Sequence, residues 1–161
     1  GQGFQPVCGF NFGAHKYDRV TRGFHFCVRS SSLILLALAV LGFAFAPQII
    51  AVFRGDDAEV IRIGALTLRL QCISFPITGF VVMSNMLLQN IAMTLRASIV
   101  AAARQGLFFV PFALILPHFF GLTGVQLCQA ASDLCAFILS ICVTVPVVQR
   151  LSEGKNPHDA I

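Results

Sequence analysis

The sequence has very little charge. Of its 161 residues, 11% are Asp, Glu, Lys or Arg, whereas 57% are hydrophobic and the mean hydropathy is +0.82. A soluble domain has about 25% charged residues, so this chain has too few of them to cover a soluble surface. The shortage excludes an ordinary soluble domain and predicts a membrane protein that is embedded in the lipid bilayer.

Several functional motifs are also missing. No basic run is interleaved with aromatic residues, so nucleic acid is not an expected partner. The six cysteines form no C-x-x-C pair, which removes the spacing of a metal or dithiol site; Cys128, Cys135 and Cys142 recur every seven positions and are expected as small residues at a helix contact. The absence of a glycine-lysine phosphate loop and of clustered catalytic groups argues against an ATP-driven pump, an enzyme and a bound cofactor.

Long uncharged runs organise the chain. A bilayer-spanning helix needs about 20 mostly apolar residues. Residues 30–53, 70–95, 97–116 and about 122–148 are expected to form four such helices, with the "PHFFGLTG" stretch separating the last two. The uncharged opening, residues 1–14, is expected to be part of a fifth span. The predicted fold is therefore all-α, a polytopic transmembrane helix bundle of four full spans plus part of a fifth.

Basic residues between the spans predict the orientation, because cytoplasmic loops carry the excess of Lys and Arg. Residues 15–29 contain four basic residues against one acidic residue, whereas residues 54–62 contain two against three. Arg96 lies in a short third loop, His118 in a loop without formal charge, and the tail (150–161) is basic near its start. We expect a multi-pass cell-membrane protein with residues 15–29, Arg96 and the tail in the cytoplasm, and residues 54–62 and His118 outside.

One expected span carries a stripe of polar side chains, which in membranes face the bundle interior or a water-filled cavity. At 100° per residue, five polar residues of residues 70–95 fall within about 60° of one another: Gln71, Ser74, Thr78, Asn85 and Gln89. Val81 and Leu88 are expected to face lipid. Pro76 removes a backbone donor from this helix, so a kink is expected there.

The last span carries a second stripe. Five polar residues again fall within about 60° of one another: Gln126, Gln129, Asp133, Ser140 and Thr144. Asp133 is the only acidic residue inside any expected span. It either contributes to a substrate or cation pathway or has a packing role, capping a helix or pairing with an Arg such as Arg104. Arg104 itself is expected to snorkel toward the cytoplasmic interface.

Two stretches resemble the multidrug and toxic compound extrusion (MATE) transporters. They are "GQGFQPVCGFNFGAHKYDRV", which carries a glutamine-glycine, glutamine-proline and asparagine–glycine-alanine signature, and "RQGLFFVPFALILPHFFGLTGVQLCQAASD", which is similar to the terminal helix pair. The resemblance implies a twelve-helix protein of two six-helix lobes around a central cavity. Residues 1–149 would be a partial C-terminal lobe, with the N-terminal lobe as partner and residues 150–161 as a cytoplasmic tail. The residues that match the family motifs are Gln5, Pro6, Asn11, Gly13, Arg104, Gln105 and Asp133.

The resemblance also implies a function. The chain would be a fragment of a secondary active efflux antiporter that exports small amphipathic or cationic compounds in exchange for Na+ or H+. Nine residues of the two polar stripes, all except Thr144, are the expected substrate and cation pathway. An alternative is a lipid-linked oligosaccharide flippase of related fold, which needs basic residues facing the cavity, and here only Arg69 and Arg104 are candidates. An integral-membrane enzyme ranks last.

Overall fold

The chain folds into an all-α bundle. Its structure, a computed structural model, describes residues 1–53 and 58–157. In these residues the element order is α1 (Phe4–Gly13), α2 (Tyr17–Ala44), α3 (Ala46–Phe53), α4 (Ala58–Asn90), α5 (Thr94–Ala102), η1 (Ala103–Leu107, one stretch of π-helix) and α6 (Phe109–Ser152). Three segments of the described chain are long and apolar enough to cross a membrane: Tyr17–Ala44, Ile61–Asn90 and Gly124–Ser152. The predicted all-α membrane helix bundle is confirmed.

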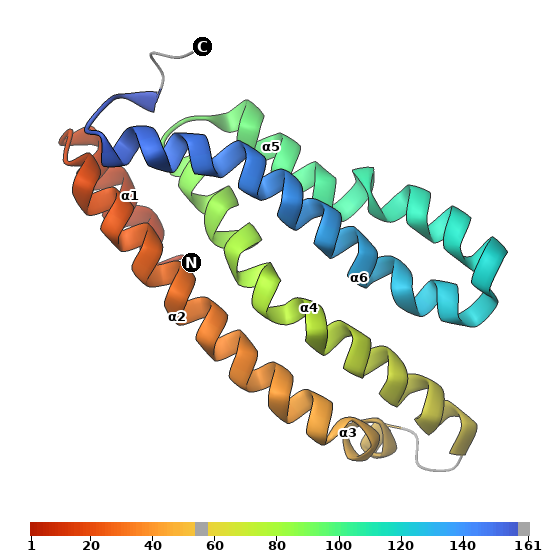
Figure 1. Cartoon of the computed structure of the whole chain (residues 1–161). Coiled ribbons are helices and arrows are strands. Elements are labelled where there is room, and N and C mark those ends of the chain that lie inside the picture. The colour runs from red at the N-terminus through yellow and green to blue at the C-terminus, as the bar shows by residue number, and fades with distance from the viewer. Residues whose placement is uncertain (54–57, 158–161) are drawn as a thin grey trace.

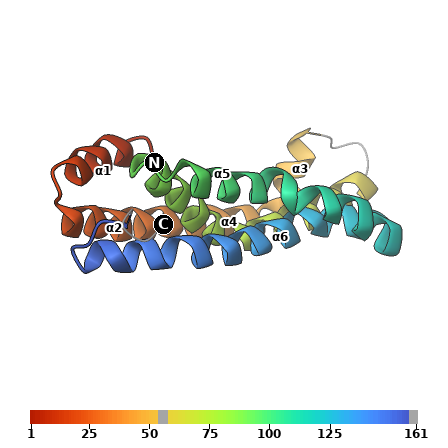
Figure 2. The same ribbon diagram turned by 90° about the horizontal axis from the view of Figure 1, so that it is seen from above.

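Helix α4 is the centre of the bundle, because it packs against α1, α2, α3, α5 and α6. Figure 1 shows it between α2 and α6, and Figure 2 shows α1 and α3 projecting from the same side at opposite ends. Pro76 lies inside α4, whose ribbon changes direction near its middle, as the missing backbone donor predicts. The main apolar cluster lies at the α1 end and includes Val20, Leu87, Leu88, Val100, Val147 and Leu151.

The prediction that residues 15–29 form a loop is wrong for most of that range. Helix α2 begins at Tyr17, so only three residues, 14–16, connect it to α1. The basic residues lie on the first turns of a helix that continues into its apolar part, and Arg22 Nε donates to Asp18 Oδ1 at 3.3 Å, one turn away. Such i,i+4 pairs stabilise a helix beyond its apolar segment. The number of charged residues alone predicts a loop there.

The expected span at residues 97–116 is interrupted. It begins as α5, continues through the π-helix η1 and ends in the first arm of α6, Phe109–Phe119. The predicted break after it is confirmed, because Gly121 has φ 56° and ψ −131°, which a residue with a side chain rarely adopts. A Cβ on Gly124 would lie 2.2 Å from the Leu116 carbonyl oxygen, so the two arms of α6 approach closely at this turn.

Helix α2 is the most peripheral of the three long helices. Of the 18 consecutive residues of α2 with the highest hydropathy, only 6% are buried. The exposed apolar residues of α2 include Leu33, Ile34, Leu36, Leu38, Val40 and Leu41. Hydrocarbon chains are as apolar as these side chains, so the bilayer is their natural surrounding. Gly42 differs from them, since a Cβ there would lie 2.8 Å from Cys72 Sγ of α4. The absence of a side chain therefore sets how closely α2 and α4 approach.

The cysteine face of α6 is only partly a helix contact. Cys128 is buried, Cys135 is half-buried and Cys142 is exposed, so the prediction that all three fill a contact is wrong for Cys142. The reason is geometric: residues seven apart drift by about 20° per step around a straight α-helix, so the three cysteines do not face the same neighbour throughout.

Candidate functional site

The polar stripe of α4 changes character along the helix. Ser74 is buried, Gln71, Thr78 and Asn85 are half-buried, and Gln89 is exposed. The hydroxyls bond within the helix, with Ser74 Oγ 2.9 Å from the Gln71 carbonyl oxygen and Thr78 Oγ1 3.1 Å from that of Ser74. Gln89 Nε2 donates to Asn85 Oδ1 at 3.2 Å. Ser74 and Thr78 thus have acceptors within the helix, whereas the amide of Asn85 is half-buried and that of Gln89 is exposed.

The stripe of α6 is more enclosed. Gln126, Asp133, Ser140 and Thr144 are buried and Gln129 is half-buried. The hydroxyls of Ser140 and Thr144 have no hydrogen-bond partner among the described residues. Because a buried polar group without a partner is costly, these hydroxyls are positions where water or a ligand atom fits the chemistry.

The two stripes meet at Asp133, which is 4% exposed. Ser74 Oγ donates to its Oδ2 atom at 3.2 Å, and Gln129 Nε2 donates to its Oδ1 atom at 3.2 Å. Arg104 Nε lies 3.6 Å from the same Oδ1. One carboxylate therefore joins α4, η1 and α6. This geometry is compatible with both roles expected for Asp133, in the pathway or in packing. The pair with Arg104 that a packing role requires is present, but the two atoms are farther apart than in a hydrogen bond.

That Arg104 snorkels toward the cytoplasmic interface stays a prediction, and the structure shows a contact of its side chain within the bundle. It lies in the π-helix η1, and its side chain, 34% exposed, is turned toward the carboxylate of Asp133. Its backbone carbonyl accepts a bond from Ser132 Oγ at 3.4 Å, which ties η1 to α6 beside the ion pair. A π-helical turn has one more residue than an α-helical turn, so side-chain directions shift in a way that a 3.6-residue period cannot predict.

A small hollow lies on the other side of Arg104. It has a volume of about 140 Å³ between α4 and α5, and its polar lining consists of Asn85, Gln89 and Arg104. Arg104 thus lies between a partly exposed pair of amides and a buried carboxylate. The charged group that lines this hollow is therefore the guanidinium of Arg104, and the carboxylate of Asp133 lies on its other side.

The nine predicted pathway residues do not share one cavity in the described structure. Asn85 and Gln89 line the hollow beside Arg104, whereas Gln126 lines a larger one at the opposite end of α4. Ser74, Gln129 and Asp133 form the buried network between them. The other three join neither group: Gln71 is half-buried, Thr78 bonds only to its own helix, and Ser140 lies buried in α6.

The lipid-facing prediction for Val81 and Leu88 is wrong. Their side chains are 4% and 0% exposed, and both belong to the main apolar cluster. In this half of α4, helices α1, α2, α5 and α6 surround the helix, so apolar side chains on either side of the polar stripe are enclosed by protein. Among the described side chains of α4, the large exposed apolar ones are instead Leu66, at 46%, and Ile73, at 62%.

Sequence reasoning missed two buried hydroxyls. Ser84 on α4 is fully buried and its hydroxyl has no partner among the described residues, while Ser132 on α6 is fully buried and bonds to η1. Ser84 points in a different direction around the helix axis from the residues of the polar stripe, so the stripe did not predict its burial. Ser132 is adjacent to Asp133, and that adjacency was the available signal.

The motif residues near the start of the chain belong to α1. Gln5 and Asn11 are half-buried, Pro6 and Gly13 are exposed, and Asn11 Nδ2 donates to the Val7 carbonyl oxygen at 2.8 Å. Helix α1 packs against α2 and α4, whereas Asp133 is bound by α4, η1 and α6. The first motif therefore lies away from the Asp133 network, on a helix that packs through the buried residues Phe4 and Cys8. Gln105 lies in η1, next to Arg104.

Comparison with known proteins identifies a family. A family model described as MatE matches residues 1–115, which is more than two thirds of the chain and includes the first motif, α4 and Arg104. No curated protein and no solved structure matches the chain. The terminal stretch with Asp133 lies beyond the matched residues, so its place in the site comes from the geometry above. The chain belongs to the MatE family, the MATE-type membrane transporters.

Proposed function

We propose that this chain forms part of a secondary active efflux antiporter that moves amphipathic or cationic compounds across the cell membrane. The observation that carries the proposal is the buried carboxylate of Asp133, which Arg104 approaches to 3.6 Å and which two neutral donors hold. Inside a membrane, such a carboxylate is expensive and is characteristic of ion and substrate paths. Family membership supports transport in general.

The proposed mechanism is an exchange of cations at Asp133. In the structure, the cation paired with Asp133 is Arg104, but its Nε atom lies too far from the carboxylate for a strong hydrogen bond. A cationic substrate that reaches the carboxylate replaces Arg104, whose side chain is one-third exposed and can turn toward Asn85 and Gln89. Na+ or H+ entering in exchange would neutralise the same carboxylate and release the substrate.

The partner lobe completes this path. The described hollows at Arg104 and at Gln126 are separate, so a continuous cavity requires a second surface facing α4 and α6. We propose that an N-terminal lobe supplies it. The basic start of α2 and the basic tail would then lie in the cytoplasm, by the distribution of Lys and Arg.

A charge-specific substitution tests the proposal in the intact transporter that contains this chain. Asp133→Asn keeps the shape of the side chain and removes its charge. We expect export of cationic substrates to fall at least tenfold while export of neutral substrates changes less than twofold, at equal protein level. Asp18→Asn, which makes the same substitution at an exposed carboxylate paired with Arg22, serves as control. Normal export of both substrate types by Asp133→Asn would assign the carboxylate to packing alone.

The coupling ion is tested separately in proteoliposomes. Substrate movement is measured with an imposed Na+ gradient and with an imposed proton gradient, for the native protein and for Asp133→Asn. We expect one gradient to drive transport in the native protein and neither to drive it in the variant. Movement that is independent of both gradients would contradict antiport and favour a facilitated or flippase-type mechanism.

A further inference from the structure

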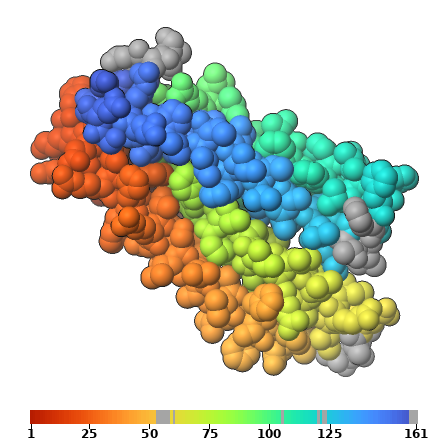
Figure 3. Space-filling model, viewed as in Figure 1, coloured from red at the N-terminus to blue at the C-terminus, as the bar shows by residue number. Residues whose placement is uncertain are grey.

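The carboxylate of Asp133 receives donors from three helical segments. Ser74 of α4 donates to Oδ2, Gln129 of α6 donates to Oδ1, and Arg104 of η1 lies on the Oδ1 side. Helices α4 and α6 pack against each other, and Figure 3 shows the surfaces of α4 and of the second arm of α6 meeting. The network therefore lies at a helix contact, where three side chains share the two oxygen atoms of one carboxylate.

The distances at Oδ1 are in the reverse of the usual order. Gln129 Nε2 lies 3.2 Å from this oxygen, whereas the charged Nε of Arg104 lies 3.6 Å from it. Hydrogen bonds between ions are ordinarily the shorter ones, about 2.7–2.9 Å, and a guanidinium commonly binds both oxygens of a carboxylate. Here the neutral amide lies nearer to Oδ1, and Arg104 approaches from a longer distance.

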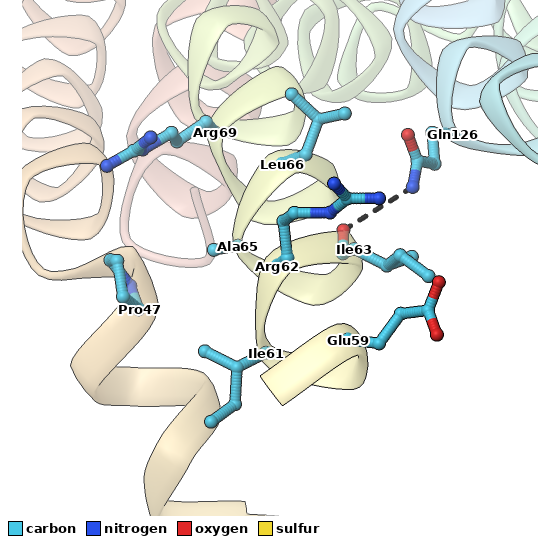
Figure 4. A pocket seen from close by; sticks show the side chains of 9 residues that line it. All are labelled: Pro47, Glu59, Ile61, Arg62, Ile63, Ala65, Leu66, Arg69 and Gln126. Carbon is cyan, nitrogen blue, oxygen red and sulfur yellow. Dashed lines mark hydrogen bonds between the residues drawn. The ribbon is translucent and has the colours of Figure 1, made fainter. Parts of the chain in front are cut away.

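Packing between helices does not account for the amide of Gln129. Its bond to Asp133 joins residues four apart on α6, so this bond ties no second helix to the bundle. The bond of Gln126 does, because its Nε2 donates to the Ile63 carbonyl oxygen of α4 at 3.4 Å (Figure 4). Within one helix such a side-chain pair stabilises only slightly. What the amide of Gln129 does is occupy Oδ1.

Ser74 contacts the other oxygen. Its hydroxyl lies 3.2 Å from Oδ2 and 2.9 Å from the Gln71 carbonyl oxygen, so its single hydrogen is shared between two acceptors. Among the described residues, the groups that contact Oδ1 are the amide of Gln129 and the guanidinium of Arg104. These two side chains therefore compete for the same atom.

Arg104 has freedom to come nearer. Its backbone carbonyl accepts from Ser132 Oγ at 3.4 Å, so α6 holds the backbone, while the side chain is 34% exposed. From 3.6 Å, a movement of about 1 Å reaches the distance of a charge-assisted bond. The amide of Gln129 is bound to the oxygen toward which the guanidinium would move.

We propose that Gln129 is a positioning residue that holds Arg104 and Asp133 apart. Its amide occupies Oδ1 and orients the carboxylate, so the pair stays loose and a cationic substrate can replace the arginine. Without this amide the arginine closes on the carboxylate and competes more strongly with the substrate. The inference rests on the proposed function, in which substrate replaces Arg104, and it names the residue that keeps this exchange possible.

The first test measures the interaction between Arg104 and Asp133 without transport. A double-mutant cycle of Arg104→Gln and Asp133→Asn is carried out on the purified chain in mixed micelles, and again in Gln129→Met, which keeps the side-chain length and removes the N–H donors. We expect the coupling factor, the ratio of unfolding constants around the cycle, to be at least fivefold larger in Gln129→Met. Gln149→Met, at an exposed glutamine near the end of α6, is the matched control and leaves it unchanged. An unchanged or smaller factor in Gln129→Met overturns the proposal.

The second test uses the intact transporter, and Gln129→Ala replaces Gln129→Met in both tests if the latter does not fold. KM and the maximal rate are measured for one cationic and one neutral substrate. We expect KM for the cationic substrate to rise at least fivefold at an unchanged maximal rate, with less than a twofold change for the neutral one. Equal losses for both substrates would show a purely structural role and overturn the proposal. Normal export by Asp133→Asn with an enlarged coupling factor in Gln129→Met would instead overturn the proposed function and support the spacing role of Gln129.

Discussion

The Nε atom of Arg104 lies 3.6 Å from Oδ1 of Asp133, with the carboxylate 4% exposed and the arginine side chain 34% exposed. One charge of the pair is therefore buried and the other lies at the edge of the bundle. Such an asymmetric pair predicts unequal effects of removing each member. Loss of the cation leaves a buried charge with neutral donors only, whereas loss of the carboxylate charge leaves a cation that can turn to solvent.

Arg104→Gln is expected to lower the free energy of unfolding by about 1–3 kcal/mol, below the usual cost of breaking a fully buried pair because the guanidinium is partly exposed. Asp133→Asn is expected to cost less. In the double variant the two losses should not add, because the interaction is already absent in each single variant. Reversible unfolding in mixed micelles, followed by circular dichroism, measures all three. Additive losses would show that the two side chains do not interact in the folded protein.

Ser74→Ala removes a hydroxyl that lies 2.9 Å from the Gln71 carbonyl oxygen and 3.2 Å from Asp133 Oδ2, so its single hydrogen is shared between the two acceptors. A hydrogen bond to a charged group contributes about 1.5–3 kcal/mol, so for a shared hydrogen we expect a loss near the lower end of that range in the same unfolding measurement. Thr78→Val is the matched control on the same helix, because its hydroxyl bonds only to the Ser74 carbonyl oxygen. A loss for Thr78→Val as large as that for Ser74→Ala would argue against a special contribution of the carboxylate.

Gly124→Ala would place a Cβ 2.2 Å from the Leu116 carbonyl oxygen, a backbone atom that cannot move aside as a side chain can. We expect this substitution to separate the two arms of α6 and to destabilise the chain by about 1–3 kcal/mol. Gly9→Ala in α1 is the control, because nothing lies within 4 Å of the added Cβ and alanine favours a helix. Thermal unfolding measures both. A normal unfolding temperature for Gly124→Ala would mean that the turn accommodates a side chain.

Asn85→Leu and Gln89→Leu remove the amides that line the hollow beside Arg104. In the intact transporter we expect each to reduce drug resistance of expressing cells at least fivefold at normal expression, because cationic substrates lose the oxygens that precede Asp133. Ile73→Leu is the appropriate control on α4, since Ile73 is exposed whereas Val81 and Leu88 are core residues. Equal effects of Ile73→Leu and Asn85→Leu would remove the case for the polar stripe.

Orientation is tested by labelling single cysteines with an impermeant reagent in a background without the six native cysteines. Lys16 and Glu59 are exposed and lie near opposite ends of the long helices. We expect Glu59→Cys to react in intact cells and Lys16→Cys to react only after the membrane is permeabilised, in accord with the excess of basic residues near Lys16. The reverse pattern would invert the proposed topology.

Composition and helix punctuation predicted most of the fold. The shortage of charge required a membrane bundle, and the glycine and proline residues around Gly121 predicted the turn that the structure contains there. The beginning of α2 could not be predicted from charge, because a helix that extends beyond the apolar layer has the composition of a loop. The acidic residues Asp56 and Asp57, on which part of the orientation rests, and His158 in the tail lie outside the described residues.

The candidate site was predicted in part. Helical periodicity placed Ser74, Gln129 and Asp133 on inward faces, and the structure brings these three together. The direction of the Arg104 side chain depends on the π-helix, and a 3.6-residue period in the sequence does not predict a π-helix. The burial of Leu88 depends on how many helices surround α4, and one helix's own sequence does not report its neighbours.

The peripheral position of α2 has a consequence for how this sequence can change over time. Between Leu33 and Leu41 most apolar side chains are exposed, so exchanges among Leu, Ile, Val and Phe alter neither packing nor the match to hydrocarbon. Gly42 is different, because any side chain there meets Cys72 of α4. Substitutions should therefore accumulate at the exposed positions of this stretch and be rarer at the buried Ala39 and at Gly42, a pattern that an alignment of orthologous chains would test.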